Sequence, residues 1–279
     1  MVHLNRQYSP ETWDVYERLN RSLDPTGPDT LFEFANRYLA AGSRIVDAGC
    51  RDASHLVRLV GAHAEATGVG IEPVERHIAM ARDTVAASEL ADRIELVFGT
   101  LEDAGLPDGS ADLVWCRDTI EQVPALDEFL ATATALLTPA GRMIVYTNVV
   151  TVWLEPGEVA MMRRHFGVVL ANMDKRRLLD AYRASGLALE QTIVVGSEWR
   201  EWAEERTQPA SQALLQLSRL RRQRDEIVAE RGQDLYEHIE ANLHWLVFQF
   251  LGKFEPVIHV LHRAGQRPLP TGGLRRRRG

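Results

Sequence analysis

Cysteine and long apolar runs are scarce in this sequence of 279 residues. The two cysteines, Cys50 and Cys116, lie far apart and outside any Cys-x-x-Cys pair, which excludes a disulfide framework and favours a reducing compartment. No apolar run approaches the ~20 residues that a membrane-spanning helix needs. The first residues also lack the apolar core of a signal peptide. Together these absences predict a cytoplasmic protein with no membrane partner.

Metal-binding and nucleic-acid-binding patterns are missing as well. The nine histidines form no His-x-x-x-His pair and no Cys/His cluster, so we expect no metal site. A formal net charge of −7 argues against a nucleic-acid partner, because nucleic acids select basic domains. Arginines gather locally at Arg219–Arg224 and at Arg275–Arg278. We expect a solvated helix face at the first place and a disordered tail, 266–279, at the second.

Short β-like runs alternate with helical stretches from residue 44 to about residue 200, which is the pattern of a parallel sheet with crossover helices. The expected strands are 44–48, 66–71, 94–98, 111–116, 142–147, 187–195 and 256–262. The expected helices between them are 55–63, 73–87, 126–137 and 174–185. The sequence therefore predicts an α/β fold with a seven-stranded, mostly parallel sheet and helices on both of its faces.

This order of elements divides the chain into successive parts. We expect lead-in helices over 1–43, a sheet core over 44–205, a helical insertion over 206–251 and a last strand within 252–265. The insertion repeats apolar side chains at helical spacing, and such a stripe must be buried. The nearest surface that could bury the stripe is the carboxyl edge of the sheet, so the insertion is predicted to form a lid there. Whether the chain forms a homodimer stays open.

The loop after the first strand has the chemistry of an amino-acid binding site. Ligands of open α/β sheets bind outside the carboxyl ends of the strands. Gly49 permits a sharp turn and close backbone approach, and the following helix start offers free N–H groups to a carboxylate. Asp47 is placed to accept hydrogen bonds from an ammonium group. A ligand that carries both groups is therefore expected at this loop.

Four segments, in order, resemble the class I S-adenosylmethionine (SAM)-dependent methyltransferases over about residues 40–200. They are Asp47–Gly49, Leu106–Val114, Ile120–Pro124 and Leu136–Arg142. The resemblance implies a Rossmann-like fold and SAM as the cofactor. It also implies a cofactor-binding role for four residues of the first loop, namely Asp47, Gly49, Cys50 and Asp52.

The first two cofactor-binding motifs depart from the family pattern. Arg51 and Ala53 stand where the later glycines of the first motif usually stand. Family members usually end strand two with an acid that holds both ribose hydroxyls, and Gly70 occupies the aligned position. Glu72 points to the same face as residue 70 if the strand continues. Because a carboxylate accepts well from two hydroxyls, we expect Glu72 to replace the missing acid.

Polar residues after the third and fourth strands are further candidates for the cofactor site. Thr100 stands where the family often has an aspartate for the adenine amino group, and Leu101 is expected to offer its backbone N–H to the ring. Arg117 and Asp118 follow the fourth strand, beside the position that the resemblance implies for the sulfonium. We expect Arg117 to contact the cofactor and Asp118 to act in catalysis.

The acceptor side is predicted from residues after the fifth and sixth strands. Glu155 and His165 are expected to face the acceptor as catalytic groups, with His165 the better generic base by its pKa. Trp153, Trp199 and Trp202 are expected to line the substrate pocket, although such aromatics also seal domain edges.

These features favour methyl transfer to a small or medium organic acceptor, at oxygen or nitrogen before carbon, by in-line displacement in a capped pocket. Two alternatives stay open. The Arg219–Arg224 cluster would suit C-methylation of a prenyl diphosphate or another anionic acceptor. The eroded first motif would suit a catalytically silent SAM-binding or assembly protein. An NAD-dependent oxidoreductase is disfavoured, because the loop lacks Gly-x-Gly-x-x-Gly.

Overall fold

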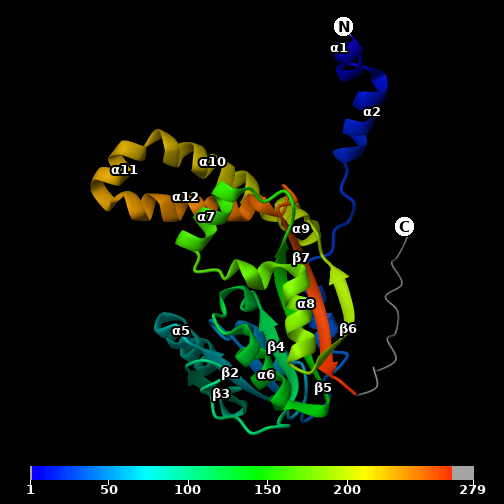
Figure 1. Cartoon of the computed structure of the whole chain (residues 1–279), viewed down its shortest axis with the longest axis vertical. Coiled ribbons are helices and arrows are strands. Elements are labelled where there is room, and N and C mark those ends of the chain that lie inside the picture. Colours follow the sequence, from blue (N-terminus) through cyan, green and yellow to red (C-terminus); the bar gives the residue numbers. More distant parts are fainter. Residues whose placement is uncertain (1, 266–279) are drawn as a thin grey trace.

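One seven-stranded sheet organises the computed structural model, which describes residues 2–265 (Figure 1). The strands are β1 Arg44–Ala48, β2 Thr67–Glu72, β3 Ile94–Phe98, β4 Ala111–Arg117, β5 Leu137–Val150, β6 Leu187–Val194 and β7 Phe254–Arg263. Their order is β3-β2-β1-β4-β5-β7-β6, and β7 runs antiparallel to both of its neighbours while the other pairs are parallel. The expected mostly parallel sheet is confirmed. The tail expected over 266–279 lies outside the described residues.

Helices cover both faces of the sheet. One face carries α3 Thr30–Ala35, α4 Ser54–Gly61 and α5 Glu75–Ala86, and the other carries α6 Leu126–Leu136 and α8 Lys175–Ala184. Successive strand residues enter opposite cores: Ile45 packs on the first side and Val46 on the second, as the two-residue repeat of a strand requires. Both are fully buried, which explains why two apolar residues stand side by side in β1.

Strand β5 is longer than the sequence predicted, because the expected strand covered only 142–147. Pro139 and Gly141 indicated a turn, and the pairing with β4 is interrupted there: Leu137 pairs with Ala111, and the regular register resumes with Arg142 opposite Leu113. A bulge therefore absorbs the turn residues within the strand. At the other end, pairing with β7 continues as far as Val150. This extension carries the following segment well past the sheet's carboxyl edge.

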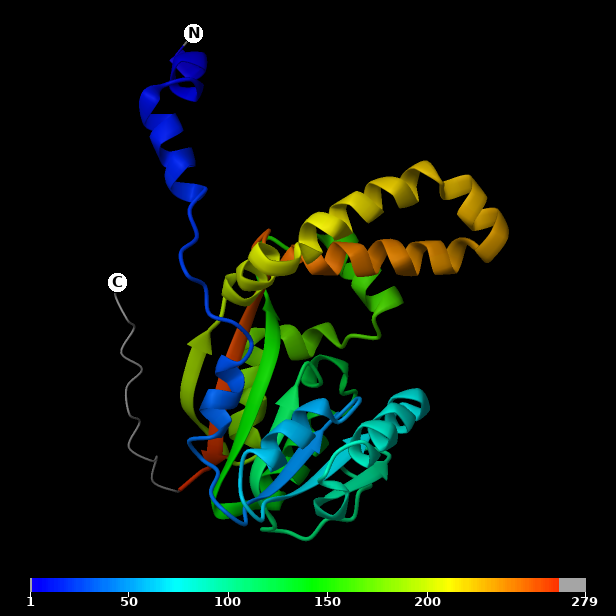
Figure 2. The ribbon, with the colours of Figure 1, turned by 180° about the vertical axis from the view of Figure 1, so that it is seen from behind.

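The helical insertion before the last strand is confirmed, but it begins earlier than residue 206. It consists of α9 Glu198–Thr207, α10 Pro209–Arg222, α11 Arg224–Arg231 and α12 Gln233–Phe248. Helix α9 lies at the carboxyl end of the sheet, whereas α10 to α12 form a hairpin that projects away from it (Figures 1 and 2). Tyr236 and Leu243 of α12 pack with Leu217 and Leu220 of α10. Much of the apolar stripe thus closes the hairpin on itself instead of covering the sheet edge, which corrects the expected placement.

The end of α12 returns to the body of the protein. There Trp245 and Phe248 pack on Phe254, at the start of β7, and Met162 of α7 Pro156–His165 joins the same cluster. The hairpin is therefore anchored at its base, beside the strand ends. None of the described helices is both long and apolar enough to cross a bilayer.

The lead-in segment divides into a packed part and a projecting part. Helix α3 buries Leu31, Phe32 and Phe34 against the sheet. Helices α1 Val2–Gln7 and α2 Pro10–Leu19 stand away from the body (Figure 2). The α2 helix has no buried residue, and Trp13 is 56% exposed. Helix α3 and the residues just after it therefore carry the core contacts described for this segment, among them Leu39.

Candidate functional site

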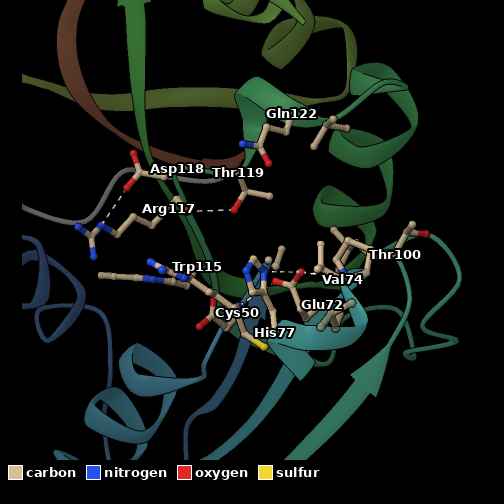
Figure 3. Close-up of a pocket in the computed structure, with 18 of the residues that line it drawn as sticks. Cys50, Glu72, Val74, His77, Thr100, Trp115, Arg117, Asp118, Thr119 and Gln122 are labelled. Carbon is tan, nitrogen blue, oxygen red and sulfur yellow. Dashed lines mark hydrogen bonds and ion pairs between the residues drawn. The ribbon is translucent and has the colours of Figure 1, made fainter. Parts of the chain in front are cut away.

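Two neighbouring cavities open at the carboxyl ends of the strands. The first, which we call the strand-end cavity, has a volume of ≈ 540 Å³ and is formed by the segments that follow β1, β2, β3 and β4 (Figure 3). The second, the lid cavity, measures ≈ 390 Å³ and lies between the strand ends and helices α9 and α12. Arg117, Asp118 and Gln122 line both cavities. The two spaces therefore meet at these three residues.

All the residues predicted to bind the cofactor line the strand-end cavity. They are Asp47, Gly49, Cys50, Asp52, Glu72, Thr100, Leu101 and Arg117. They come from four different segments of the chain, and the parallel strands bring them to one edge of the sheet. The structure thus assembles the set that the sequence proposed, although it does not by itself assign their roles.

The loop after β1 keeps the backbone path of a glycine-rich motif without the glycines. Gly49, Arg51 and Ala53 all have positive φ, at 83°, 51° and 58°. A left-handed conformation costs a non-glycine residue about 1–2 kcal/mol. The loop is held by the N–H of Gly49, which donates to the Ile71 carbonyl at 2.8 Å, and by the N–H of Arg51, which donates to Glu72 Oε2 at 2.9 Å. The loop has therefore lost two glycines of the motif but keeps the backbone conformation that those glycines would adopt.

Gly49 is required by space as well as by conformation. A Cβ atom at this position would lie 2.7 Å from Cγ2 of Thr119, which is closer than real side chains approach. Thr119 belongs to the turn after β4, so the two loops touch here. This close approach explains why only the first glycine of the motif persists.

Glu72 is the last residue of β2, so an acid does end this strand, and the predicted strand end at Ile71 was one residue early. Gly70 has no room for a carboxylate, because its Cβ would meet Cys50 Sγ and Leu96 Cδ2, both at 2.9 Å. The Glu72 side chain is buried and also accepts the N–H of Val74 at 3.0 Å.

The strand-end cavity is strongly acidic. Five carboxylates line it, against two arginines: Asp47, Asp52, Glu72, Glu102 and Asp118 against Arg51 and Arg117. Burial, and then the charge of Glu72, raise the pKa of Asp47 to about 8, while Arg117 opposes the shift. A cationic ligand would relieve this accumulation of negative charge.

The far rim of the strand-end cavity is formed by the turn after β3. Thr100 donates its hydroxyl to Asp103 Oδ2 at 2.9 Å, so that hydroxyl is already engaged within the turn. The Leu101 side chain is buried. Figure 3 shows Thr100 at this rim, away from Arg117 and Asp118.

Arg117 and Asp118 occupy the junction of the two cavities. Arg117 Nη1 donates to His55 Nε2 at 2.6 Å, and its Nε lies 3.4 Å from Asp118 Oδ2. Burial and then the Arg117 charge lower the pKa of His55 to about 4, which keeps the ring neutral. Asp118 has φ +53°, and about half of its side chain (51%) is open to the cavities while protein surrounds the rest. That surrounding protein raises the pKa of Asp118, and Arg117, Arg200 and Arg51 oppose the rise.

The lid cavity has aromatic walls. Tyr146 of β5 stacks on Trp199 of α9 with ring centroids 4.7 Å apart and planes 15° apart. Phe166 and Trp245 form a second pair at 5.1 Å, and Trp202 of α9 completes the set. Trp199 and Trp202, which the sequence analysis expected at a substrate pocket, therefore both line the lid cavity.

One end of the lid cavity is polar and joins four elements. Arg200 Nε donates to Gln249 Oε1 at 2.7 Å, and Gln249 Nε2 donates to Asn148 Oδ1 at 2.8 Å. The N–H of Asn148 donates to Oε1 of Glu121, in the short helix η2 Ile120–Gln122, at 2.8 Å. No hydrogen bond of regular geometry reaches Glu121 Oε2 or the hydroxyl of Thr147. We call Arg200, Gln249, Asn148 and Glu121 the polar relay.

The segment before α3 closes one side of the lid cavity. Thr26 Oγ1 donates to Glu198 Oε2 at 2.5 Å, at the start of α9. Gly27 lies against the ring of Trp202, where a Cβ atom would come within 2.7 Å of Cε2, and Pro28 lines the cavity. This segment, residues 26–28, is a strap that ties the N-terminal part of the chain to the lid.

Three predicted acceptor-side residues lie outside both cavities. Trp153 is 70% exposed on the turn after β5, and Glu155 forms the capping box of α7 with Glu158. His165 ends α7 and faces Glu237, with Nε2 3.6 Å from Oε2. The expectation that these residues face the acceptor was wrong in position, because the long β5 strand carries them past the cavity and α7 packs on α12.

The Arg219–Arg224 cluster also lies away from the cavities, on the projecting hairpin. Arg221 Nε donates to Glu240 Oε1 at 2.9 Å, and Arg224 pairs with Asp225 at 3.5 Å. The sequence-based interpretation as a solvated helix face fits this position. Within residues 2–265, no three His, Cys, Asp or Glu side chains gather closely enough to hold a metal ion.

Known proteins resemble the chain chiefly over its sheet core. Residues 46–145 match a protein-family model described as a methyltransferase domain. The 27-O-demethylrifamycin SV methyltransferase of Amycolatopsis mediterranei is 27% identical over 106 residues, 38% of this chain and 38% of that protein. The mitochondrial ubiquinone biosynthesis O-methyltransferase of Schizosaccharomyces pombe is 29% identical over 141 residues, 48% of this chain and 49% of that protein. The chain therefore spans about half or less of each relative's length.

Two solved structures share the fold over most of the chain. The cyclase SpnF superposes with a TM-score of 0.66 at 18% identity, covering 85% of this chain and 80% of that chain. A geranyl diphosphate methyltransferase in complex with SAM has a TM-score of 0.63 at 15% identity, covering 85% of each. Such low identities concern the fold alone. Residues 46–145 thus match a methyltransferase domain, and the fold around them is the one that these two solved structures share.

Proposed function

We propose that the protein transfers the methyl group of SAM to an oxygen or nitrogen atom of a small or medium organic acceptor bound in the lid cavity. The observation that carries this proposal is the junction at Arg117, Asp118 and Gln122, where an acidic cavity meets an aromatic one. A donor and an acceptor bound side by side would react there without leaving the protein.

The strand-end cavity fits SAM in size and in charge. Its volume of ≈ 540 Å³ lies in the range of cofactor sites. Bound SAM supplies a sulfonium-activated methyl group, and its net positive charge suits a cavity with five carboxylates. Asp47 would accept from the ammonium group, Glu72 from the ribose hydroxyls, and the backbone at Leu101 would contact the adenine.

Asp118 is the proposed proton acceptor, because its carboxylate faces both cavities at their junction. As the acceptor oxygen forms its bond to the methyl carbon, the carbon–sulfur bond breaks and its electron pair stays on sulfur. The hydroxyl proton passes to the Asp118 carboxylate, and Arg117 stabilises the ionised form beforehand. The positions of Glu155 and His165 leave them no part in this step.

The names of the two relatives support oxygen as the accepting atom. One is called an O-methyltransferase, and the other is named for a 27-O-demethyl substrate. Methylation of a prenyl diphosphate is less well supported, since the Arg219–Arg224 cluster lies on the hairpin. A silent SAM-binding protein is disfavoured by the open lid cavity beside the donor site. The two buried, unpaired cysteines support a cytoplasmic location.

The proposal is tested in two steps. Calorimetry should detect SAM and S-adenosylhomocysteine (SAH), whereas NAD should not bind. Incubation with isotopically labelled SAM and a library of hydroxylated and amino-bearing small molecules, followed by mass spectrometry, should then yield a methylated product. Binding of NAD with no binding of SAH would overturn the proposal.

A further inference from the structure

The lid cavity is electrically balanced, unlike its neighbour. Two carboxylates, Asp118 and Glu121, and two arginines, Arg117 and Arg200, line it. Both arginines are already engaged, because Arg117 contacts Asp118 and His55 while Arg200 donates to Gln249. A diphosphate would bring several charges into a space with no free cation among the described lining residues. The charge balance therefore favours a neutral acceptor.

The walls of the lid cavity favour a flat acceptor. Five aromatic rings line a space of ≈ 390 Å³, namely Tyr146, Phe166, Trp199, Trp202 and Trp245. Their order is fixed by mutual contacts, such as the stacked Tyr146–Trp199 pair and the tilted Phe166–Trp245 pair. Aromatic side chains bind planar rings by offset stacking or edge contacts, beyond the effect of apolar burial alone.

The polar relay favours hydroxyl or carbonyl substituents on that ring. Asn148, Gln249 and Glu121 are all at least 95% buried, and buried polar groups normally have all their partners. The relay nevertheless ends on Glu121 Oε2, which makes no hydrogen bond of regular geometry and has the Thr147 hydroxyl as its neighbour. Burial, and then the charge of Asp118, raises the pKa of Glu121 to about 7, so this carboxyl tolerates either a donor or an acceptor as a new partner.

We infer that the acceptor is a neutral, hydroxylated aromatic ring system, stacked among the rings of the lid cavity and selected by Gln249 of the polar relay. Gln249 is the specificity-determining residue because its amide joins the lid helix α9, through Arg200, to the strand residue Asn148 by hydrogen bonds. This inference rests on the proposed function, since it names the substrate class of that site.

The test measures equilibrium binding of three bicyclic probes and one prenyl diphosphate. Tryptophan fluorescence reports the binding, with and without saturating SAH. The probes are a dihydroxynaphthalene, unsubstituted naphthalene, the saturated decalin diol and geranyl diphosphate. The dihydroxynaphthalene should bind at least about tenfold more tightly than the decalin diol and geranyl diphosphate. Equal or tighter binding of either of those two would overturn the inference.

Two variants locate the binding and the selectivity. Trp199→Leu should weaken dihydroxynaphthalene binding about 3- to 10-fold, whereas the matched change Trp13→Leu, on the exposed α2 helix, should have no effect. Gln249→Leu should weaken the dihydroxynaphthalene about 5- to 10-fold and leave naphthalene unchanged, which also serves if Trp199→Leu unfolds. An unchanged preference for the hydroxylated ring in Gln249→Leu would overturn the role of Gln249. If SAH fails to bind by calorimetry, the proposed function falls, while the probe ranking still tests the cavity.

Discussion

The backbone N–H of Arg51 donates to the Glu72 carboxylate at 2.9 Å, and this bond ties the loop after β1 to the end of β2. One carboxylate thereby holds the loop after β1 and also lines the strand-end cavity. The proposed ribose-binding role of Glu72 would therefore couple the conformation of this loop to the binding of SAM.

Glu72→Gln should weaken SAM or SAH binding by about 1.5–3 kcal/mol, the usual range for hydrogen bonds to a charged group. The amide keeps one acceptor oxygen but cannot satisfy the Arg51 and Val74 N–H groups together with ribose hydroxyls. Titration calorimetry measures the loss. Glu89→Gln, at an exposed position, is the matched control and should bind like the wild type. Equal affinities would show that the ribose is held elsewhere.

Asp47 should make the ligand-free protein less stable as pH rises. Its folded pKa of about 8 lies above the ordinary value, so its contribution to stability is fully present below about pH 4 and is lost as pH rises through about 8. Asp47→Asn should remove this loss and stabilise the free protein by about 1–3 kcal/mol at pH 8–9. Thermal melts from pH 5 to pH 9 measure the difference.

The same Asp47 variant should lose the pH dependence of ligand binding. An ammonium group favours the ionised carboxylate, so wild-type affinity for SAH should rise from pH 6 to pH 8 with release of a proton. Calorimetry in two buffers of different ionisation enthalpy counts that proton. A wild-type affinity that stays flat over this range would contradict the placement of the ammonium at Asp47.

Arg51→Gly should leave the free energy of unfolding unchanged or raise it by up to about 1 kcal/mol. Glycine removes the strain of the left-handed backbone at φ +51°, and the entropy that glycine loses on folding costs less than that strain. The matched change Arg82→Gly, on the exposed side of helix α5, should instead cost about 1 kcal/mol. Urea unfolding compares the two. Destabilisation of both variants by the same amount would show that the Arg51 side chain matters more than its backbone.

Asp118→Asn should lower methyl transfer to a hydroxyl acceptor about 10²- to 10⁴-fold, the range for loss of a general base. SAH affinity should change much less. Because burial raises the pKa of Asp118, the wild-type rate should increase with pH as the carboxylate ionises, and the variant should lose that limb of the profile. A variant with unchanged turnover would exclude Asp118 as the proton acceptor.

Local sequence patterns were sufficient for the order of the strands, and together with the family resemblance they predicted residues that line the strand-end cavity. Strands such as β1 are buried on both faces, so they appear as apolar runs, and the order of strand-end loops follows from the parallel topology. The positive φ angles at Arg51 and Ala53 were not predictable, because nothing in those residue types demands a left-handed backbone. The second strand was predicted to end at Ile71, so Glu72 was not recognised as its last residue.

The acceptor side could not be derived in the same way. Tyr146, Arg200 and Gln249 come from β5, α9 and the end of α12, and only tertiary packing brings them together. The apolar stripe of 206–251 indicated burial but not the partner, and α10 supplied that partner in place of the sheet edge. His165 and Glu155 suited the chemistry but not the geometry, since β5 ran farther than its turn residues suggested.

The strap at residues 26–28 makes the N-terminal boundary a practical matter for anyone producing the protein. A shortened version that starts before Thr26 keeps the bond to Glu198 and the contact with Trp202, while one that starts at α3 leaves the tryptophan ring bare. Two preparations with identical sheets would then differ in one wall of the lid cavity. An affinity tag fused close to the strap would likewise stand beside that cavity.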